Sequence, residues 1–85
     1  MSKPTPLPNR FDVTYEGTDF VQNITISSDY LATGNSVYSG YDVTTTKPVG
    51  DVIVNNGGNL KIKANEATLT KNVEVKLGGT LLISI

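Results

Sequence analysis

Eight carboxylates are the residues of this chain best suited to chemistry, because paired acids can hydrolyse glycosides and clustered acids can bind calcium. They are Asp12, Glu16, Asp19, Asp29, Asp42, Asp51, Glu66 and Glu74. Each stands alone beside a turn or on the polar face of an expected strand, which is typical of solvated surface acids. Asp29, Asp42 and Asp51 could add backbone carbonyls to bind calcium, but the sequence lacks the alternating acidic loop of an EF-hand. We therefore predict no metal site.

The chain has no histidine and no cysteine, which removes disulfides and the usual zinc ligands. A serine or threonine nucleophile would need a base, and lysine, the remaining option, occurs in no recognisable catalytic motif. The sequence thus predicts no catalytic residue, no cofactor and no enzymatic activity.

Three tyrosines, Tyr30, Tyr38 and Tyr41, fall within twelve residues among Ser, Thr, Asn and Asp. This mixture is typical of surfaces that bind proteins or glycans, since a tyrosine ring gives contact area at low entropic cost. The alternative is an aromatic cap that closes the end of a core. Coplanar exposed rings would favour glycan binding, whereas rings folded onto Val37 and Val43 would favour the cap.

Composition limits the fold and the partners. Eighty-five residues make one small domain, and seven basic against eight acidic residues give a net charge of −1, which offers no stripe for phosphates. We therefore expect no nucleic-acid partner. Abundant Thr, Ser, Asn, Gly and Val favour short strands over helices, and without an apolar run of 18 residues we expect no transmembrane segment.

The chain divides into an arm and a domain. Residues 1–10 contain prolines at alternate positions, which favours an extended arm or linker to an upstream domain. A proline-rich peptide ligand is the alternative, but the spacing does not match P-x-x-P. Residues 11–85 are expected to form a single all-β domain. Within it, we expect strands at 11–15, 19–26, 37–38 and 41–45, with turns at 27–29, 33–35, 39–40 and 47–50.

The C-terminal half contains an internal repeat, because residues 51–64 return as residues 72–85, 21 positions later. The identical pairs are Val52/Val73, Val54/Val75, Gly57/Gly78, Gly58/Gly79, Leu60/Leu81 and Ile62/Ile83. They describe strand, Gly-Gly corner, strand, which predicts a β-solenoid-like stack with a coil of about 21 residues. Ala67 and Leu69 would lie on the third side. At the Gly-Gly corners we expect positive φ or close backbone approach.

A second geometry fits the same residues. The segment Asn55-Asn-Gly-Gly58 also suits a type I′ hairpin turn, so the repeat could form two packed hairpins instead of coils. Both geometries are all-β and both place the same side chains inside.

The run from Val52 to Leu81, with its two Gly-Gly pairs and alternating aliphatics, is similar to the three-coathanger stack domain. Asn35-Ser-Val37 resembles an earlier copy. The run departs from the family pattern at Asn72-Val73, where Gly and an aromatic are usual, and at Leu81. The family recurs near the C-terminal ends of secreted bacterial surface proteins. The resemblance implies a stack of bent hairpins in an exported protein, acting as an accessory or spacer module without chemistry of its own.

The chain end is apolar. Residues 81–85 form a strand-like run without a charged gatekeeper, so we expect an unpaired edge that associates with an identical chain or an adjacent domain of a parent protein. This association would bury Leu82 and Ile85 on the face opposite Leu81 and Ile83.

The expected function is a non-enzymatic structural or interaction module that is secreted or at the cell surface. Met1-Ser-Lys3 lacks the apolar region of a signal peptide, so this expectation assumes that an export signal has been removed. The alternative function is a small carbohydrate-binding module that uses the three tyrosines.

Overall fold

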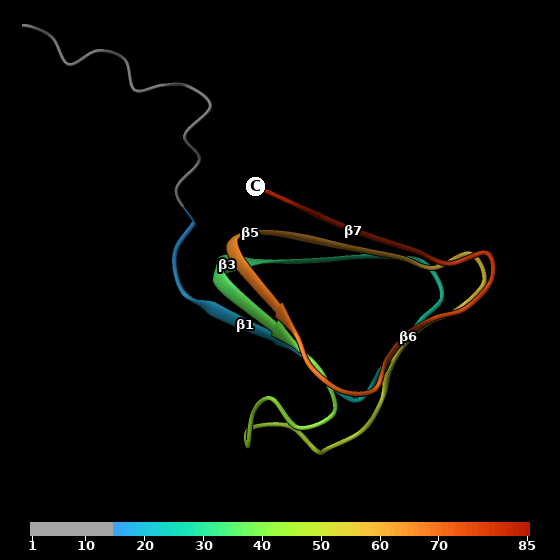
Figure 1. Cartoon of the computed structure of the whole chain (residues 1–85), viewed down its shortest axis with the longest axis horizontal. Helices are drawn as coiled ribbons and strands as arrows, with labels where there is room; N and C mark the ends of the chain where they lie inside the picture. Colours follow the sequence, from blue (N-terminus) through green and yellow to red (C-terminus); the bar gives the residue numbers. More distant parts are fainter. Residues whose placement is uncertain (1–14) are drawn as a thin grey trace, which may run out of the picture.

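The computed structural model describes residues 15–85, which form seven strands and no helix (Figure 1). The strands are β1 (Thr18–Val21), β2 (Ile24–Ile26), β3 (Asp29–Ser39), β4 (Val52–Val54), β5 (Asn59–Leu69), β6 (Val73–Val75) and β7 (Thr80–Ser84). The predicted all-β class is confirmed. The expected arm at 1–10 and most of the expected strand at 11–15 lie outside the described residues, and Tyr15 is not in a strand.

All strand pairs among the described residues are parallel. One sheet has the order β1-β3-β5-β7, and the other has the order β2-β4-β6. A hairpin joins antiparallel strands, so the hairpin geometry is wrong for this chain. The bent hairpins implied by the family resemblance are likewise not what residues 15–85 form.

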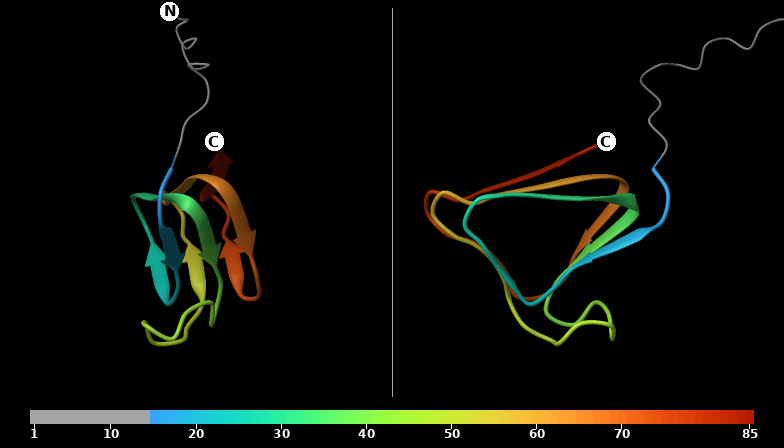
Figure 2. Two further views of the ribbon diagram at one scale, coloured as in Figure 1. Left: turned by 90° about the vertical axis from the view of Figure 1, so that its left-hand side faces the viewer. Right: turned by 180° about the vertical axis from the view of Figure 1, so that it is seen from behind.

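Seen end-on, the chain follows a triangular path, as Figure 2 shows on the right. Strands β2, β4 and β6 lie along one side. The long strands β3 and β5 bend and supply two sides, and β7 and β1 each extend one of these. We call residues 24–34 the first layer, residues 52–64 the middle layer and residues 73–84 the last layer.

The register aligns the repeated positions. Val52 pairs with Val73 and Leu60 pairs with Leu81. Between the first and middle layers the offset is larger, because Ile24 pairs with Val52. Twelve residues, 40–51, connect β3 to β4, whereas three residues, 70–72, connect β5 to β6. The longer connector is the loop that leaves the triangle at the bottom of Figure 1.

The bend in β3 corrects the expected turn at residues 33–35. Ala32 and Gly34 are buried before the bend, and Val37 and Ser39 are buried after it, so the inward face changes from even to odd positions. At the bend, the backbone N–H groups of residues 35 and 36 both donate to the Gly17 carbonyl, at 2.8 and 3.3 Å. The segment is therefore a corner inside one strand, with ladder pairing on both sides of it.

The two Gly-Gly corners behave as predicted. Gly57 and Gly78 have φ of 83° and 86°, and the glycine after each donates a hydrogen bond of 2.8 Å to the carbonyl three residues earlier. This geometry is typical of a type II turn. A Cβ at Gly58 would collide with the Ile26 carbonyl, and one at Gly79 would lie 2.7 Å from the Val54 carbonyl. Each pair thus combines one positive φ with one close backbone approach.

Two expected strands differ from the structure, one because it is interrupted and one because it does not form. The expected strand at 19–26 is divided into β1 and β2, because Asn23 takes φ of 55° and turns the chain at a corner. The expected strand at 41–45 lies in the connector and pairs with no strand. The expected strand at 37–38 is part of β3.

The core is a single cluster along the inside of the triangle. Its buried members are Val21, Ile26, Ala32, Val37, Val52, Val54, Leu60, Ile62 and Ala64. Because parallel partners stack, these residues lie in columns that run through the layers; Ala32 and Ile62, for example, share a column that continues to Ile83 on β7.

Candidate functional site

The last layer is exposed where the middle layer is buried. Ile62 is 1% exposed and its partner Ile83 is 46% exposed, and Val54 is 0% exposed while its partner Val75 is 41% exposed. The backbone register aims all four side chains at the same interior. The difference therefore arises from position in the stack, since strands β6 and β7 each come last in their sheets.

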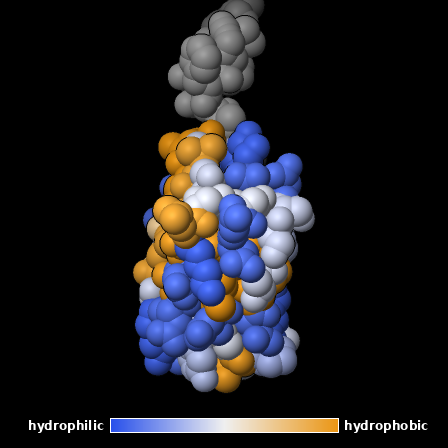
Figure 3. All heavy atoms as spheres, turned by 90° about the vertical axis from the view of Figure 1, so that its right-hand side faces the viewer, coloured by the Kyte–Doolittle hydropathy of each residue, from blue (hydrophilic) through white to orange (hydrophobic). Residues whose placement is uncertain are grey.

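The exposed apolar residues around this end form what we call the C-terminal apolar end. Its members are Leu69, Val75, Leu77, Leu82, Ile83 and Ile85. In Figure 3 the apolar surface gathers along the left edge of the view, which is the end of the stack that carries β7. Contiguous apolar surface beside unpaired strand edges is typical of interaction sites.

Leu82 and Ile85, the two residues expected to associate at the edge, are both exposed. Leu82 is 51% exposed and pairs with Lys61, which is also exposed, so it lies on the outer face of β7. Ile85 follows the end of β7 and is 70% exposed. The association of these two residues with a partner, and the face that Ile85 presents, stay predictions.

The other members of the C-terminal apolar end were not predicted as exposed. Val75 and Ile83 were recognised as inward-facing, but their exposure depends on which layer comes last. Leu69 is on the inward row of the bent half of β5, where it pairs with the fully buried Ser39. Leu77 is 97% exposed and occupies the β6–β7 corner. Its exposure could have been predicted from the sequence, because a leucine in a turn has no strand neighbours to cover it.

The three tyrosines have different surroundings. Tyr30 is half-buried at the start of β3, pairs with the buried Leu60 and packs against the core cluster. Tyr38 lies on the outer face after the bend, where its ring stacks on Phe20 with centroids 5.8 Å apart. The ring of Tyr41 lies in the connector, with the Lys71 ammonium 5.6 Å from its centroid. The proposed binding surface of three tyrosines stays a prediction, and Tyr30 has the environment expected of a cap.

Three of the described carboxylates, Asp29, Asp42 and Asp51, form separate polar pairs at a strand end or in the connector. Asp29 accepts a hydrogen bond from the Asn59 amide at 2.9 Å, and Asp51 accepts one from Asn72 at 3.1 Å. Asp42 lies 3.5 Å from the Lys71 ammonium. Within residues 15–85, no three acidic side chains gather in a group that could hold a metal ion. Asp12 lies outside the described residues.

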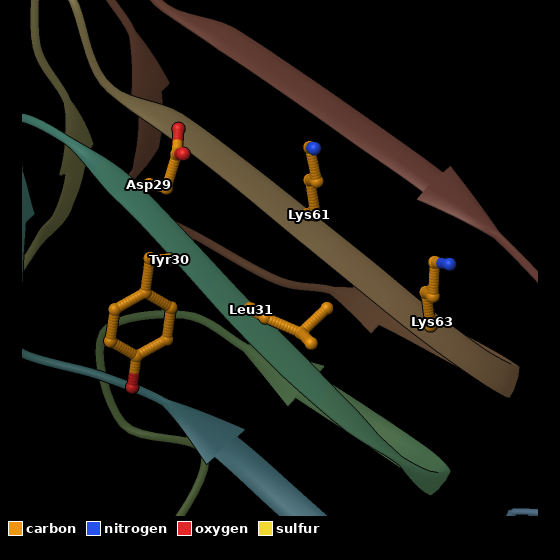
Figure 4. A pocket seen from close by; sticks show the side chains of 5 residues that line it. All are labelled: Asp29, Tyr30, Leu31, Lys61 and Lys63. Atoms are coloured by element: carbon orange, nitrogen blue, oxygen red, sulfur yellow. The ribbon is translucent and has the colours of Figure 1, made fainter.

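An open depression of about 340 Å³ lies on the face of β3 and β5 (Figure 4). It is lined by Asp29, Tyr30, Leu31, Lys61 and Lys63. The two lysines stand two residues apart on β5, and Leu31 is 57% exposed. The depression thus combines one tyrosine and one leucine with three charged residues, and among the described residues Asp29 forms no ion pair with either lysine.

A buried amide fixes the connector. Gln22 is 4% exposed, and its Nε2 lies 3.1, 2.9 and 3.0 Å from the carbonyl oxygens of Thr44, Lys47 and Pro48. Its Oε1 accepts a hydrogen bond of 2.9 Å from the Thr44 N–H. This anchor was missed, because nothing in the local sequence distinguishes Gln22 from a surface residue.

Among residues 15–85, no helix has the length and apolar character that a membrane crossing requires. Comparisons of this chain with protein-family models, curated proteins and solved structures give no match.

Proposed function

We propose that this chain is a non-enzymatic structural and interaction module of an exported bacterial protein, built as a short β-solenoid with a coil of about 21 residues. In this role it acts as an accessory or spacer element that holds neighbouring parts apart and docks through its C-terminal apolar end. The observation that carries the proposal is the parallel register of Val52 with Val73 and of Leu60 with Leu81.

The outer surface supports a rigid spacer. Polar side chains on neighbouring layers pair across the strands: the Asn65 side-chain amide donates to Oδ1 of Asn35 at 3.0 Å, and the Asn59 side-chain amide donates to Oδ1 of Asp29 at 2.9 Å. These side-chain hydrogen bonds join strands that are already paired through their backbones, and they add to the stability of the sheet. Aliphatic columns inside and hydrogen-bonded pairs outside both favour a stiff stack.

The proposed export rests on composition and on the family resemblance. A surface rich in Thr, Asn and Ser with little charge suits an extracellular module, and the three-coathanger stack family is the one that the Gly-Gly repeat resembles. The coils proposed here have parallel strands, so the proposed relationship concerns the repeat pattern and the accessory role.

We do not propose the carbohydrate-binding alternative. It requires rings that present one surface, whereas Tyr30 packs on the core and Tyr38 stacks on Phe20.

A coil-insertion variant tests the proposed architecture. A second copy of residues 52–72 is placed between residues 72 and 73, which adds one 21-residue coil in register. Because stacked repeats add stability through their interfaces, we expect a folded β-protein with one cooperative unfolding transition, a higher Tm and a larger denaturant m-value. The inserted amides should be protected from hydrogen exchange.

The control carries an insert of the same composition in which the Gly-Gly pair is moved by three positions. This insert should remain unprotected, because the corner glycines no longer meet the backbone of the preceding layer. If the in-register insert is equally unprotected while the parent chain is folded, the solenoid proposal is wrong.

A further inference from the structure

The free edge of β7 is defined by its hydrogen bonds. The Thr80 N–H donates to the Gly58 carbonyl at 3.0 Å, so Thr80 directs its backbone groups toward β5. Because backbone direction alternates along a strand, Leu82 and Ser84 do the same. The N–H and C=O groups of Leu81 and Ile83 therefore point away from the sheet, at an edge with no neighbouring strand among the described residues.

We propose that this edge pairs with the β7 edge of a second copy of the chain, antiparallel about a two-fold axis at Leu82. This inference deepens the interaction role proposed above and rests on it. Leu81 then faces Ile83 of the other copy, and the two pairs related by the axis are the hydrogen-bonded pairs of an antiparallel ladder. Leu82 faces its own counterpart at a non-hydrogen-bonded position, where side chains approach most closely.

The side chains of β7 are self-complementary in this register. Leu81 and Ile83 meet on the inner face, which continues the columns of Leu60 and Ile62. Thr80 faces Ser84, so the ends of the paired strands match hydroxyl with hydroxyl. No charged residue lies on β7, and no like charges are brought together.

The neighbouring strand β6 lacks this complementarity. Two copies of β6 paired about their midpoints would place Glu74 against Glu74, and like charges directly opposite each other are destabilising. Strand β7 is therefore the one that forms the contact between the copies.

The other end of the stack explains why the assembly closes at two copies. In the first layer, Ile26 is 3% exposed and Ala32 is 0% exposed, so at these inward positions the described part of this end offers no apolar surface to a neighbouring C-terminal apolar end. Head-to-tail stacking would need both ends open. A two-fold contact uses the open end of each copy and leaves none free.

The test measures the mass of the full chain over a range of concentrations by light scattering and sedimentation equilibrium. We expect a monomer–dimer equilibrium. Leu82→Lys places two ammonium groups opposite each other and should weaken dimerisation at least about tenfold. Leu31→Lys is the matched control, because Leu31 is an exposed residue in the same outer row, two layers away, and its substitution should leave the dimer unchanged.

The register is tested by a single cysteine, since the chain has none of its own. Cα atoms at a non-hydrogen-bonded antiparallel position lie about 4.5 Å apart, within disulfide range. Oxidised Leu82→Cys should therefore form a covalent dimer, and Leu31→Cys should not. A monomer at all concentrations, a dimer that Leu82→Lys does not weaken, or an assembly that keeps growing with concentration would each overturn the pairing. A folded coil-insertion variant alongside any of these results would leave the proposed module intact.

Discussion

The two ends of the stack have equivalent inward-facing positions, but the side chains at these positions differ in exposure. Ala32 in the first layer and Ile83 in the last layer belong to one column, with exposures of 0% and 46%. In the neighbouring column the exposures are 3% for Ile26 and 41% for Val75. Backbone pairing alone therefore does not bury a side chain, and each end needs a separate means of closure.

The first layer is closed by small residues and by the preceding chain. Gly34 lies so near that chain that a Cβ there would be 3.1 Å from the Gly17 carbonyl. The same inward row holds Ala64 in the middle layer, so along this row the interior narrows from the middle layer to the first. In the neighbouring row of Ala32, the last layer carries the larger and half-exposed Ile83, which suits a contact with another apolar surface.

The largest expected effect is a difference in stability between alanine variants of two corner glycines, Gly58 and Gly79. Gly58→Ala drives a methyl group into the Ile26 carbonyl, which is fixed within the stack, and should cost at least about 3 kcal/mol of unfolding free energy. Gly79→Ala should cost clearly less, because the last layer can shift outward. Denaturant unfolding of both variants measures the difference. Equal losses would show that the last layer is as constrained as the middle one.

Truncating an inward side chain in the middle layer and its partner in the last layer compares the same two layers. Ile62→Ala removes buried contacts and should lower the unfolding free energy by about 2 to 5 kcal/mol. Ile83→Ala removes a side chain that is 46% exposed and should cost the monomer less than half as much. Measured at dilution and at high concentration, the loss for Ile83→Ala should grow with concentration. A loss that stays constant would argue against its burial on pairing.

Stability should depend on a single atom of Gln22, the side-chain nitrogen that anchors the connector. Gln22→Glu replaces an amide donor with a carboxylate that faces three carbonyl oxygens, and should cost about 3 kcal/mol because the donor is lost and a charge is buried. Asp42→Asn is the control in the same connector. It removes a surface ion pair with Lys71 and should change stability by less than about 1 kcal/mol. Thermal unfolding of the two variants gives the comparison.

The smallest expected effect is a gain in stability. Ser39 is fully buried, and its hydroxyl has no hydrogen-bond partner among the described residues. Ser39→Ala removes this unsatisfied group and should raise the unfolding free energy by about 1 kcal/mol. A lower Tm for this variant would contradict the assignment and indicate that the hydroxyl is hydrated or bonded.

Alternating aliphatics and Gly-Gly pairs predicted the strands and corners within residues 52–64 and 73–84, because each inward position there is aliphatic and each corner is Gly-Gly. At residues 19–26 the prediction missed the break at Asn23 between β1 and β2, and at 41–45 it was wrong, because this Thr-rich segment forms no strand. The outcome there depends on Asn23 and on contacts of Gln22 with residues more than twenty positions away, which a local pattern does not contain.

The candidate site was predicted in part. The uncharged run at residues 81–85 indicated an edge, and Leu82 lies on the face expected of it. Leu69 and Val75 were missed, because their partners one layer earlier, Ser39 and Val54, are fully buried. Exposure in a stack depends on the number of layers above a residue, and the sequence of one layer does not record that number.

The way in which Gln22 holds the connector has a consequence for how this fold can diversify. All four hydrogen bonds of its side chain are made to main-chain groups of residues 44, 47 and 48, which every amino acid possesses in some form. This anchor therefore does not select the side chains at residues 44, 47 and 48. We expect substitutions to be tolerated best at residues 44–48, whereas Gly40 and Gly50 at the two ends of the connector have no room for a Cβ.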